Sequence, residues 1–466
     1  MQHRRSAFAS ALVGAVLAPA LLLPSATPVA SASGPAATAG VSAVERAAAK
    51  PQPTRFSLSP GVTFNNPTGG RDSRRAILDR ILAAIRHARN GSTIQIMTWN
   101  YLTDEATNAL LAAQKRGAVV RVLIDQANAN DETPNPPFNR LRRELRANNG
   151  NKPYAQRSAA KTCQNSCRGR GGAAHSKYYL FSHTGSSRRV VMQGSANLTA
   201  AMANNQWNEI FTYVDRPIIW DFMQDRFDEA WKDTPVKRAF SQVQDGGYGI
   251  YMSPNYGPDW VSDPIIDALD QVRCRGAVDA GNANGRTIIR TSPDVIRGKR
   301  GMTAARQLRA LWEQGCDVHI VYTVMGGDVR RYLRNPSGRG AVPMKHLVQD
   351  FNDDGEFDNY FHLKVWTING RMGSNRTAYL AFNGSANTSD LATNSDEITG
   401  IFTTRYRVLR YQGFIDYWFD NPPAGYDATG TGSSTTGGAA GRTASPWTQR
   451  MVQLGLIDPY AHVDLD

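Results

Sequence analysis

The stretch "AAHSKYYLFSHTGSSRRVVMQGSANLT" occupies residues 173–199, and "YFHLKVWTINGRMGSNRTAYLAFNGSANTSD" occupies residues 360–390. Both contain His-x-Lys, an apolar run, a glycine-containing turn, a second apolar run and Gly-Ser-Ala-Asn. Residues two apart on an extended chain point to the same side, so the His and the Lys of each copy should project from one face. Self-similarity on this scale predicts two copies of one structural unit.

The segments that precede each stretch repeat as well. "LLAAQKRGAVVRVLID" at 110–125 aligns without gaps with "LRALWEQGCDVHIVYT" at 308–323. From periodicity and from helix-stop glycines we expect the following elements, in order: a helix (71–89), strand (93–99), helix (104–116) and strand (119–125), then a helix (263–273), strand (286–291), helix (303–314) and strand (318–324). This order is typical of an α/β fold with a largely parallel, helix-covered sheet in each copy.

The ends of the chain differ from its middle. His3, Arg4 and Arg5 precede an apolar stretch at 11–23, and Ala30-Ser31-Ala32 offers a small-residue cleavage site, so residues 1–32 are predicted to be a signal peptide. No later run reaches the roughly 18 apolar residues that a transmembrane helix needs. We expect a secreted, extracellular protein. The remaining segments are predicted as a disordered lead-in (33–54), a first domain (55–250), a second domain (251–422), a Gly/Ser/Thr linker (423–446) and a short tail (447–466).

Charge and cysteine content limit the partners and the compartment. The formal net charge of the 466 residues is +13, and removing the signal peptide takes away only two arginines. Such a charge favours anionic partners such as phosphate backbones or acidic lipid surfaces, without choosing between them. Four cysteines in an exported chain favour disulfides, which we expect to join Cys163 to Cys167 and Cys274 to Cys316. A zinc site at the first pair is the competing interpretation, and it lacks a second Cys/His pair at ligand spacing.

The polar residues that recur in both copies form the candidate site. They are His175, Lys177, Ser195, Asn197 and Glu209 in the first half, and His362, Lys364, Ser385, Asn387 and Glu397 in the second. If the halves pack about a pseudo-twofold axis, both sets converge on one point. Lysine, asparagine and serine side chains can hold phosphate oxygens. One imidazole can attack phosphorus while the other protonates the leaving group. Glu209 and Glu397 would accept the other ring N–H of the two histidines.

On these residues the sequence resembles the phospholipase D superfamily over roughly residues 60–422. "HSKYYLFS" and "HLKVWTIN" supply the motif His and Lys, but the family's motif Asp is replaced by Ser182 and Asn369. The resemblance implies two α/β sandwich domains with a shared active site, a phosphohistidine intermediate and no metal or other cofactor. It also implies that His175 is the nucleophile and His362 the acid and base, although the spacing alone leaves the two roles interchangeable.

The function that we expect from this resemblance is a phospholipase D-type phosphodiesterase, a hydrolase that converts phosphatidylcholine-like lipids to phosphatidic acid at a membrane or micelle surface. A metal-independent endonuclease acting on nucleic acid is the alternative within the same superfamily. A catalytically inactive protein that binds a phosphate-bearing ligand is the alternative of another class. We expect a monomer.

Three further segments carry weaker patterns. "DFNDDGEFD" at 350–358 resembles a calcium loop but lacks the final Glu, so a solvated acidic loop is preferred. The basic residues around Cys163 and Cys167 are interpreted either as a solvated loop or as a funnel for anionic substrates; they are Arg157, Lys161, Arg168 and Arg170. The insertions at 126–174 and 325–360 are expected to form an apolar lip for lipid, with Pro136, Pro137, Phe138, Tyr332, Leu333 and Phe357 in contact with it.

Overall fold

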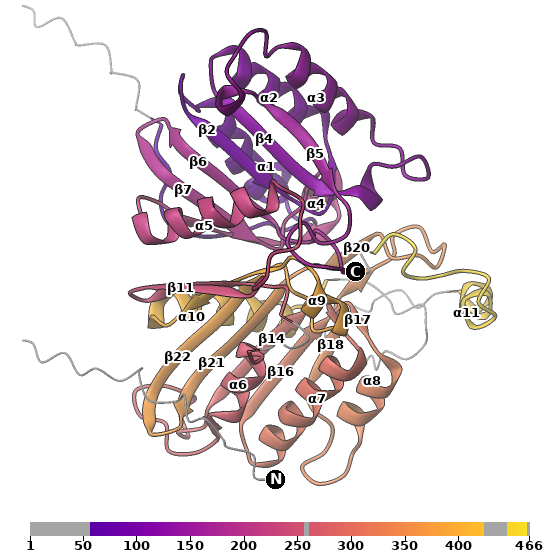
Figure 1. Cartoon of the computed structure of the whole chain (residues 1–466). Coiled ribbons are helices and arrows are strands. Elements are labelled where there is room, and N and C mark those ends of the chain that lie inside the picture. The colour runs from indigo at the N-terminus through magenta and orange to yellow at the C-terminus, as the bar shows by residue number, and fades with distance from the viewer. Residues whose placement is uncertain (1–55, 256–260, 424–444, 464–466) are drawn as a thin grey trace, which may run out of the picture. The chain divides into compact units, whose positions relative to one another are not determined.

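The computed structural model describes residues 56–255, 261–423 and 445–463. The predicted signal peptide, the predicted lead-in and most of the predicted linker therefore lie outside the described residues. Residues 54–466 form one compact unit, whose α/β architecture contains two large sheets (Figure 1). None of the described helices combines the length and the apolar character that crossing a bilayer requires.

The first sheet has the strand order β1-β10-β7-β6-β2-β4-β5. Its strands are β1 (Gly61–Phe64), β2 (Thr93–Met97), β4 (Val119–Asp125), β5 (Ala159–Cys163), β6 (Tyr178–Thr184), β7 (Ser187–Gly194) and β10 (Glu209–Tyr213). The pairs β2–β4 and β4–β5 are parallel, whereas the pairs from β1 through β10, β7 and β6 to β2 are antiparallel. The parallel part is the predicted βαβ unit, and the hairpin β6–β7 carries the first motif.

The second sheet repeats this plan, with the order β11-β12-β23-β22-β21-β14-β16-β18 and β13 paired with β21. Its strands are β11 (Ser241–Asp245), β12 (Tyr248–Met252), β13 (Val272–Arg273), β14 (Ile288–Pro293), β16 (Asp317–Tyr322), β18 (Met344–His346), β21 (Lys364–Met372), β22 (Asn375–Gly384) and β23 (Ile398–Phe402). The hairpin β21–β22 carries the second motif. Strands β11 and β12, which lie on both sides of residue 246, belong to this sheet, so the chain passes from one sheet to the other before residue 241.

Helices cover the sheets on both faces (Figure 1). They are α1 (Arg71–Arg86), α2 (Asp104–Lys115), α3 (Pro136–Ala147), α4 (Ala200–Asn204), α5 (Pro217–Ala230), α6 (Pro264–Asp270), α7 (Gly298–Glu313), α8 (Gly327–Arg334), α9 (Asp390–Asn394), α10 (Arg405–Asp420) and α11 (Pro446–Gln453). Helices α1 to α3 pack with the first sheet and α6 to α8 with the second. Residues of α5 and α10 join a third core that both sheets share.

Strand alternation explains how one sheet faces two cores. In β6, Tyr179 and Phe181 face the core under α1 to α3, while Tyr178 and Leu180 face the shared core. A strand that is buried on both faces reads as a nearly continuous apolar run, as this one does. The ends of the motif strands therefore lie beside the core that the two halves share.

The remaining elements are short. They are β3 (Tyr101–Leu102), β8 (Leu198–Thr199), β9 (Gln206–Trp207), β15 (Val295–Ile296), β17 (Val324–Met325), β19 (Val348–Gln349), β20 (Asn359–Phe361) and the 3₁₀ turns Gln126–Asn128 and Tyr154–Gln156. Strand β9 of the first half pairs with β20 of the second. This pairing ties the segment that enters β10 to the segment that enters β21.

Several predicted helices have other bounds than the sequence suggested, and α1 ends at Arg86 rather than 89. Helix α7 begins at Gly298, five residues before the expected start, because the Asp390 carboxylate accepts hydrogen bonds from the N–H groups of Lys299 and Arg300. This cap comes from a distant segment and leaves no local signal. Helix α6 ends at Asp270 rather than 273, because Val272 and Arg273 pair with β21.

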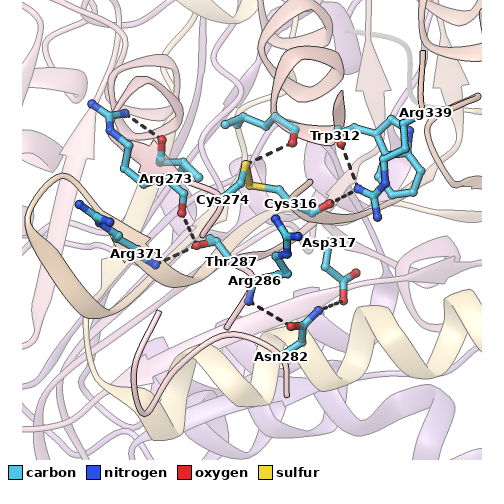
Figure 2. Close-up of a disulfide and its surroundings, with 12 residues drawn as sticks. Arg273, Cys274, Asn282, Arg286, Thr287, Trp312, Cys316, Asp317, Arg339 and Arg371 are labelled. Carbon is cyan, nitrogen blue, oxygen red and sulfur yellow. Dashed lines mark hydrogen bonds between the residues drawn. A yellow bond between two sulfur atoms is a disulfide. The ribbon is translucent and has the colours of Figure 1, made fainter. Parts of the chain in front are cut away.

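Both predicted disulfides are present, Cys163–Cys167 and Cys274–Cys316, with Cα–Cα distances of 5.2 and 4.5 Å. The second joins the segment after β13 to the start of β16 (Figure 2). Beside it, the Arg339 guanidinium donates to the Cys316 carbonyl at 2.7 Å and lies 3.6 Å from the ring centroid of Trp312. The bridge thus secures the helix-to-strand turn of the second half.

Candidate active site

The two His-x-Lys segments occupy corresponding places. His175 and Lys177 directly precede β6, and His362 and Lys364 lie at the start of β21. All four residues are buried, none more than 3% exposed. In each pair the lysine Nζ donates to the carbonyl oxygen of its own histidine, at 2.7 Å in the first half and 3.2 Å in the second. Each lysine Nζ therefore lies beside the backbone of its own histidine.

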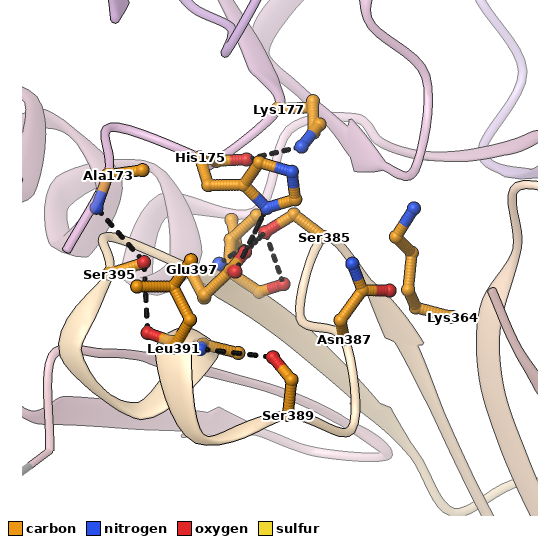
Figure 3. A network of polar contacts seen from close by, with 12 residues as sticks. Ala173, His175, Lys177, Lys364, Ser385, Asn387, Ser389, Leu391, Ser395 and Glu397 are labelled. Carbon is orange, nitrogen blue, oxygen red and sulfur yellow. Dashed lines mark hydrogen bonds and ion pairs between the residues drawn. The ribbon is translucent and has the colours of Figure 1, made fainter. Parts of the chain in front are cut away.

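The asparagines of the Gly-Ser-Ala-Asn segments are anchored in the same way. Asn197 Oδ1 accepts a hydrogen bond from the backbone N–H of Asn100 at 3.3 Å, and Asn387 Oδ1 accepts one from Val295 at 3.2 Å. Holding the amide oxygen fixes the side chain and leaves the NH₂ group as its donor end. Figure 3 shows Asn387 in one group with Lys364, Lys177 and His175.

One histidine is bound to a carboxylate from the other half. His175 Nδ1 lies 2.9 and 3.0 Å from the two carboxylate oxygens of Glu397 (Figure 3). Burial raises the pKa of Glu397 to about 7, against the opposing effects of Lys177 and of the hydrogen bond from Ser385. A carboxylate in this position fixes the ring and favours a proton, or another positive charge, on the imidazole.

The other histidine is bound to an amide. His362 Nδ1 lies 2.8 Å from Asn208 Oδ1, again across the two halves. Because an amide oxygen can only accept, this contact keeps a hydrogen on Nδ1 and leaves Nε2 as the nitrogen that titrates. Burial lowers the pKa of His362 well below 6.5, and the positive charges of Lys364, Lys177 and His175 lower it further. The two histidines therefore differ in their electrostatic surroundings.

The prediction that Glu209 orients a histidine is wrong. Glu209 is the first residue of β10, and its Oε2 accepts hydrogen bonds from Asn383 Nδ2 at 2.7 Å and Tyr411 Oη at 3.1 Å. The side chain that matches Glu397 is that of Asn208, since each stands just before the last strand of its sheet. Glu209 belongs to a buried polar cluster in the shared core, where burial raises its pKa to about 8.

The serines of both motifs orient these partners. Ser195 Oγ donates to Asn208 Oδ1 at 2.8 Å and accepts from the Glu209 N–H at 3.1 Å. Ser385 Oγ donates to Glu397 and accepts from the Ile398 N–H at 3.0 Å. Both hydroxyls are engaged in these hydrogen bonds. Instead of binding phosphate, as predicted, the serines position the groups that hold the histidines.

Two residues that the sequence reasoning missed also contact the motifs, Trp99 and Asp294. The Trp99 ring lies edge-on to His175 with 5.7 Å between centroids, and Lys177 Nζ lies 5.9 Å from its centre. The fully buried Asp294 places Oδ2 2.9 Å from Lys364 Nζ and 3.8 Å from His362 Nε2. Both follow the first parallel strand of their half, and this position at a strand's carboxyl end was the available signal.

Comparison with known proteins agrees with this arrangement. The family described as "Cardiolipin synthase, PLD-like domain" matches residues 81–231. The segment 81–231 is therefore similar to this PLD-like domain family. A search among curated proteins found no match.

Solved structures resemble the fold at low sequence identity. Phosphatidylserine synthase from Haemophilus influenzae is 13% identical, with 76% of this chain and 85% of that chain covered and a TM-score of 0.52. Polyphosphate kinase from Porphyromonas gingivalis is 12% identical, with 85% and 55% covered and a TM-score of 0.49. Nuc from Salmonella typhimurium, a phospholipase D family member, is 20% identical, with 38% and 96% covered and a TM-score of 0.28.

The two departures from the superfamily motif serve the backbone. Ser182 Oγ accepts a hydrogen bond from the Thr93 N–H at 2.8 Å. Asn369 Oδ1 accepts one from the Gly281 N–H at 2.9 Å, and its amide donates to Gln412. A carboxylate would make the same acceptor contacts, so both replacements retain an acceptor for a backbone N–H.

The Cys163–Cys167 loop contacts the backbone next to the site, and one of its four basic residues is buried. The Asp396 carboxylate accepts hydrogen bonds from the N–H groups of Cys167 at 2.5 Å and Arg168 at 3.3 Å, and Asp396 precedes Glu397. Arg168 is 1% exposed and paired with Glu229 at 3.0 Å, so it cannot belong to a surface funnel. Arg170 remains on the surface. The loop fixes the backbone that carries the carboxylate partner of His175.

A cavity of about 320 Å³ opens beside Tyr360, and His362 is not one of its wall residues. Its wall includes Tyr360, whose ring centroid lies 5.8 Å from that of His362, together with Asn100, Leu102, Asp358 and His462. The wall residues, all in the described part of the chain, contain no lysine or arginine. His462 belongs to the C-terminal tail, which contacts the 350–358 loop through the Glu356 carboxylate at 2.7 Å.

The expected apolar lip is largely internal. Phe138, Leu333 and Phe357 are completely buried in three different cores, whereas Tyr332, at 38%, and Pro136 are exposed. Pro136 and Pro137 form the first turn of α3. The insertions are folded parts of the two halves, with helices α3 and α8 of their own.

The acidic loop is organised by its own backbone. The Asp350 carboxylate accepts from the N–H groups of Asp353 and Gly355, both at 2.8 Å. Among described residues, the one cluster of potential metal ligands at ligand distance is Cys163, Cys167 and Asp233, and its cysteines form a disulfide.

Proposed function

We propose that this protein is a secreted phosphodiesterase of phospholipase D type, which releases the head group of phosphatidylcholine-like lipids through a phosphohistidine intermediate. The observation that carries this proposal is the pair of buried histidines contributed by the two halves, each held through Nδ1 by the opposite half. Because Nδ1 is engaged, Nε2 is the ring nitrogen that would react with phosphorus or transfer a proton. Two such atoms on opposite sides of one phosphate can exchange a phosphoryl group and a proton.

The different Nδ1 partners assign the roles. Attack by His175 Nε2 on phosphorus places a positive charge on that ring, which the Glu397 carboxylate at 2.9 Å stabilises. As the new P–N bond forms, the bond from phosphorus to the head-group oxygen breaks, and protonated His362 gives its Nε2 proton to that oxygen. In the second step His362 takes a proton from water, the water oxygen bonds to phosphorus, and the P–N bond breaks.

The remaining residue pairs that recur in the two halves would hold the phosphate. Lys177 and Lys364 would bring ammonium groups, and Asn197 and Asn387 amide donors, to the non-bridging oxygens. Donors that are fixed before substrate arrives stabilise the charge that develops at phosphorus. All four side chains are positioned by the backbone contacts described above.

The cavity beside Tyr360, the ring neighbour of His362, supports a lipid substrate over a nucleic acid. The head group leaves on the side of the acid, so this cavity is where it would lie. A polynucleotide would place further phosphates there, whereas the wall offers Asp358 and no lysine or arginine among the described residues. Exposed apolar side chains belong to the loop and tail that form the wall, namely Phe351, Trp447, Leu454 and Leu456. Apolar groups in such a place suit contact with an aggregated lipid.

An assay in EDTA tests the proposal. Purified mature protein should release choline or ethanolamine from phospholipid vesicles and should continue to do so at moderate salt. Plasmid nicking at low salt without head-group release would favour the endonuclease alternative, because binding to DNA weakens steeply with salt. Binding of phosphate esters without any turnover would favour the inactive binding protein. Recovery of the protein from culture medium without residues 1–32 tests secretion.

A further inference from the structure

The two halves of the site differ at one matched position. Trp99 and Asp294 are equivalent, because the Trp99 carbonyl accepts from the Asp125 N–H and the Asp294 carbonyl accepts from the Thr323 N–H, both at 3.3 Å. Each residue touches the His and the Lys of its own motif. The site therefore has an aromatic ring on the side of His175 and a carboxylate on the side of His362.

A buried carboxylate is unfavourable in a site that must bind an anion. Asp294 lies where a phosphodiester would approach Lys364, and it offsets the positive charge of that lysine. Repulsion between the carboxylate and the phosphate weakens substrate binding. The presence of Asp294 at this position therefore indicates a role in the reaction itself.

The surroundings of His362 indicate that role. The charged groups that face it are positive: Lys364 on its own strand, and Lys177 and His175 from the first half. Asn208 on Nδ1 is neutral, and Tyr360 contributes a ring edge. Asp294, 3.8 Å from Nε2, supplies the opposing negative charge at the nitrogen that must carry the transferable proton.

We propose that Asp294 is a positioning residue that favours the protonated form of His362 at Nε2 and so assists it as the general acid. This inference rests on the proposed function. Asp294 keeps its charge throughout: the proton moves from His362 Nε2 to the leaving oxygen, and a proton from water restores it. The matching position near the nucleophile His175 holds Trp99 instead of a carboxylate. The His175 imidazole must attack with a free electron pair, and it already has Glu397 on Nδ1.

The test is Asp294→Asn, which keeps the shape and removes the charge. An opposite charge at this distance supports the protonated form by about one pKa unit or more. The limb at which kcat falls with rising pH should therefore move down by about one unit, and choline release at pH 8 should fall about tenfold or more. The KM should not rise, because the site loses a negative charge. With the phosphatidyl ester of p-nitrophenol as substrate, the leaving group needs no acid. Hydrolysis of this ester should fall less than about threefold.

Controls separate this role from a structural one. Asp125 is another buried acid near His175, and its carboxylate accepts a hydrogen bond from the Ala174 N–H at 2.7 Å. Asp125→Asn should leave the alkaline limb of the kcat profile in place. If Asp294→Asn lowers the Tm by more than about 10 °C, the smaller Asp294→Ser is used with the same expectations. Equal losses for choline and p-nitrophenyl esters with an unmoved limb would overturn the proposal. Absence of any phosphodiesterase activity in the wild type would instead overturn the proposed function.

Discussion

Replacing Glu209 by Gln should stabilise the protein increasingly as the pH rises. The carboxyl group lies in the shared core, bound to Asn383 and Tyr411, and burial raises its pKa from 4.5 to about 8. Between these values the folded state holds a proton that the unfolded state releases. The free energy of unfolding therefore falls as the pH rises from about 4.5 to about 8, and the stabilising contribution is fully present only below this range.

The expected size follows from the same values. At 1.36 kcal/mol for each pKa unit, Glu209→Gln should be about as stable as the wild type near pH 4.5 and about 4 kcal/mol more stable at pH 8. Urea unfolding with intact disulfides at several pH values measures the difference. Glu132→Gln, in an exposed loop, is the matched control and should show no such trend. A difference between Glu209→Gln and wild type that stays constant from pH 5 to 8 would refute the reasoning.

Three further predictions concern the site and its supports. The double variant Cys163→Ser with Cys167→Ser should lose a larger fraction of kcat than of Tm, because the loop holds Asp396 and through it Glu397. Steady-state kinetics and thermal unfolding measure the two effects, and an unchanged kcat would contradict the prediction. Cys274→Ser with Cys316→Ser should cost about 4 kcal/mol of stability for a loop of sequence separation 42, measured by urea unfolding, while a loss below about 1 kcal/mol would contradict it. Asn208→Asp should raise the pKa of His362 and move the alkaline limb of kcat upward, and a limb that stays or moves down would count against the assigned roles.

Much of the fold could be predicted because its signals are local. The repeated His-x-Lys segments, the helix-stop glycines and the apolar runs of β4 and β6 mark elements whose residues decide their own conformation. The positions of His175, His362 and the two asparagines follow from strand alternation. The cysteine pairs follow from their number and their places in the predicted elements.

The remaining features depend on contacts between distant segments. Asn208 rather than Glu209 faces the site because β9 pairs with β20. This pairing fixes the register of β10, which begins at Glu209. Asp294 and Trp99 share no chemical similarity, so only matching backbone contacts reveal that they are equivalent. Phe138, Leu333 and Phe357 were assigned to a surface because composition does not tell an internal apolar residue from an exposed one.

The central claim is that two histidines from two halves share one phosphoryl-transfer site with different roles. The most direct measurement is peptide mass mapping of the His362→Asn variant after rapid mixing with a short-chain phosphatidylcholine and denaturation at alkaline pH. A phosphatidyl group on the peptide that contains His175, and none on the His175→Asn variant, is the predicted result. A modified residue elsewhere, or full turnover by either variant, would contradict the account.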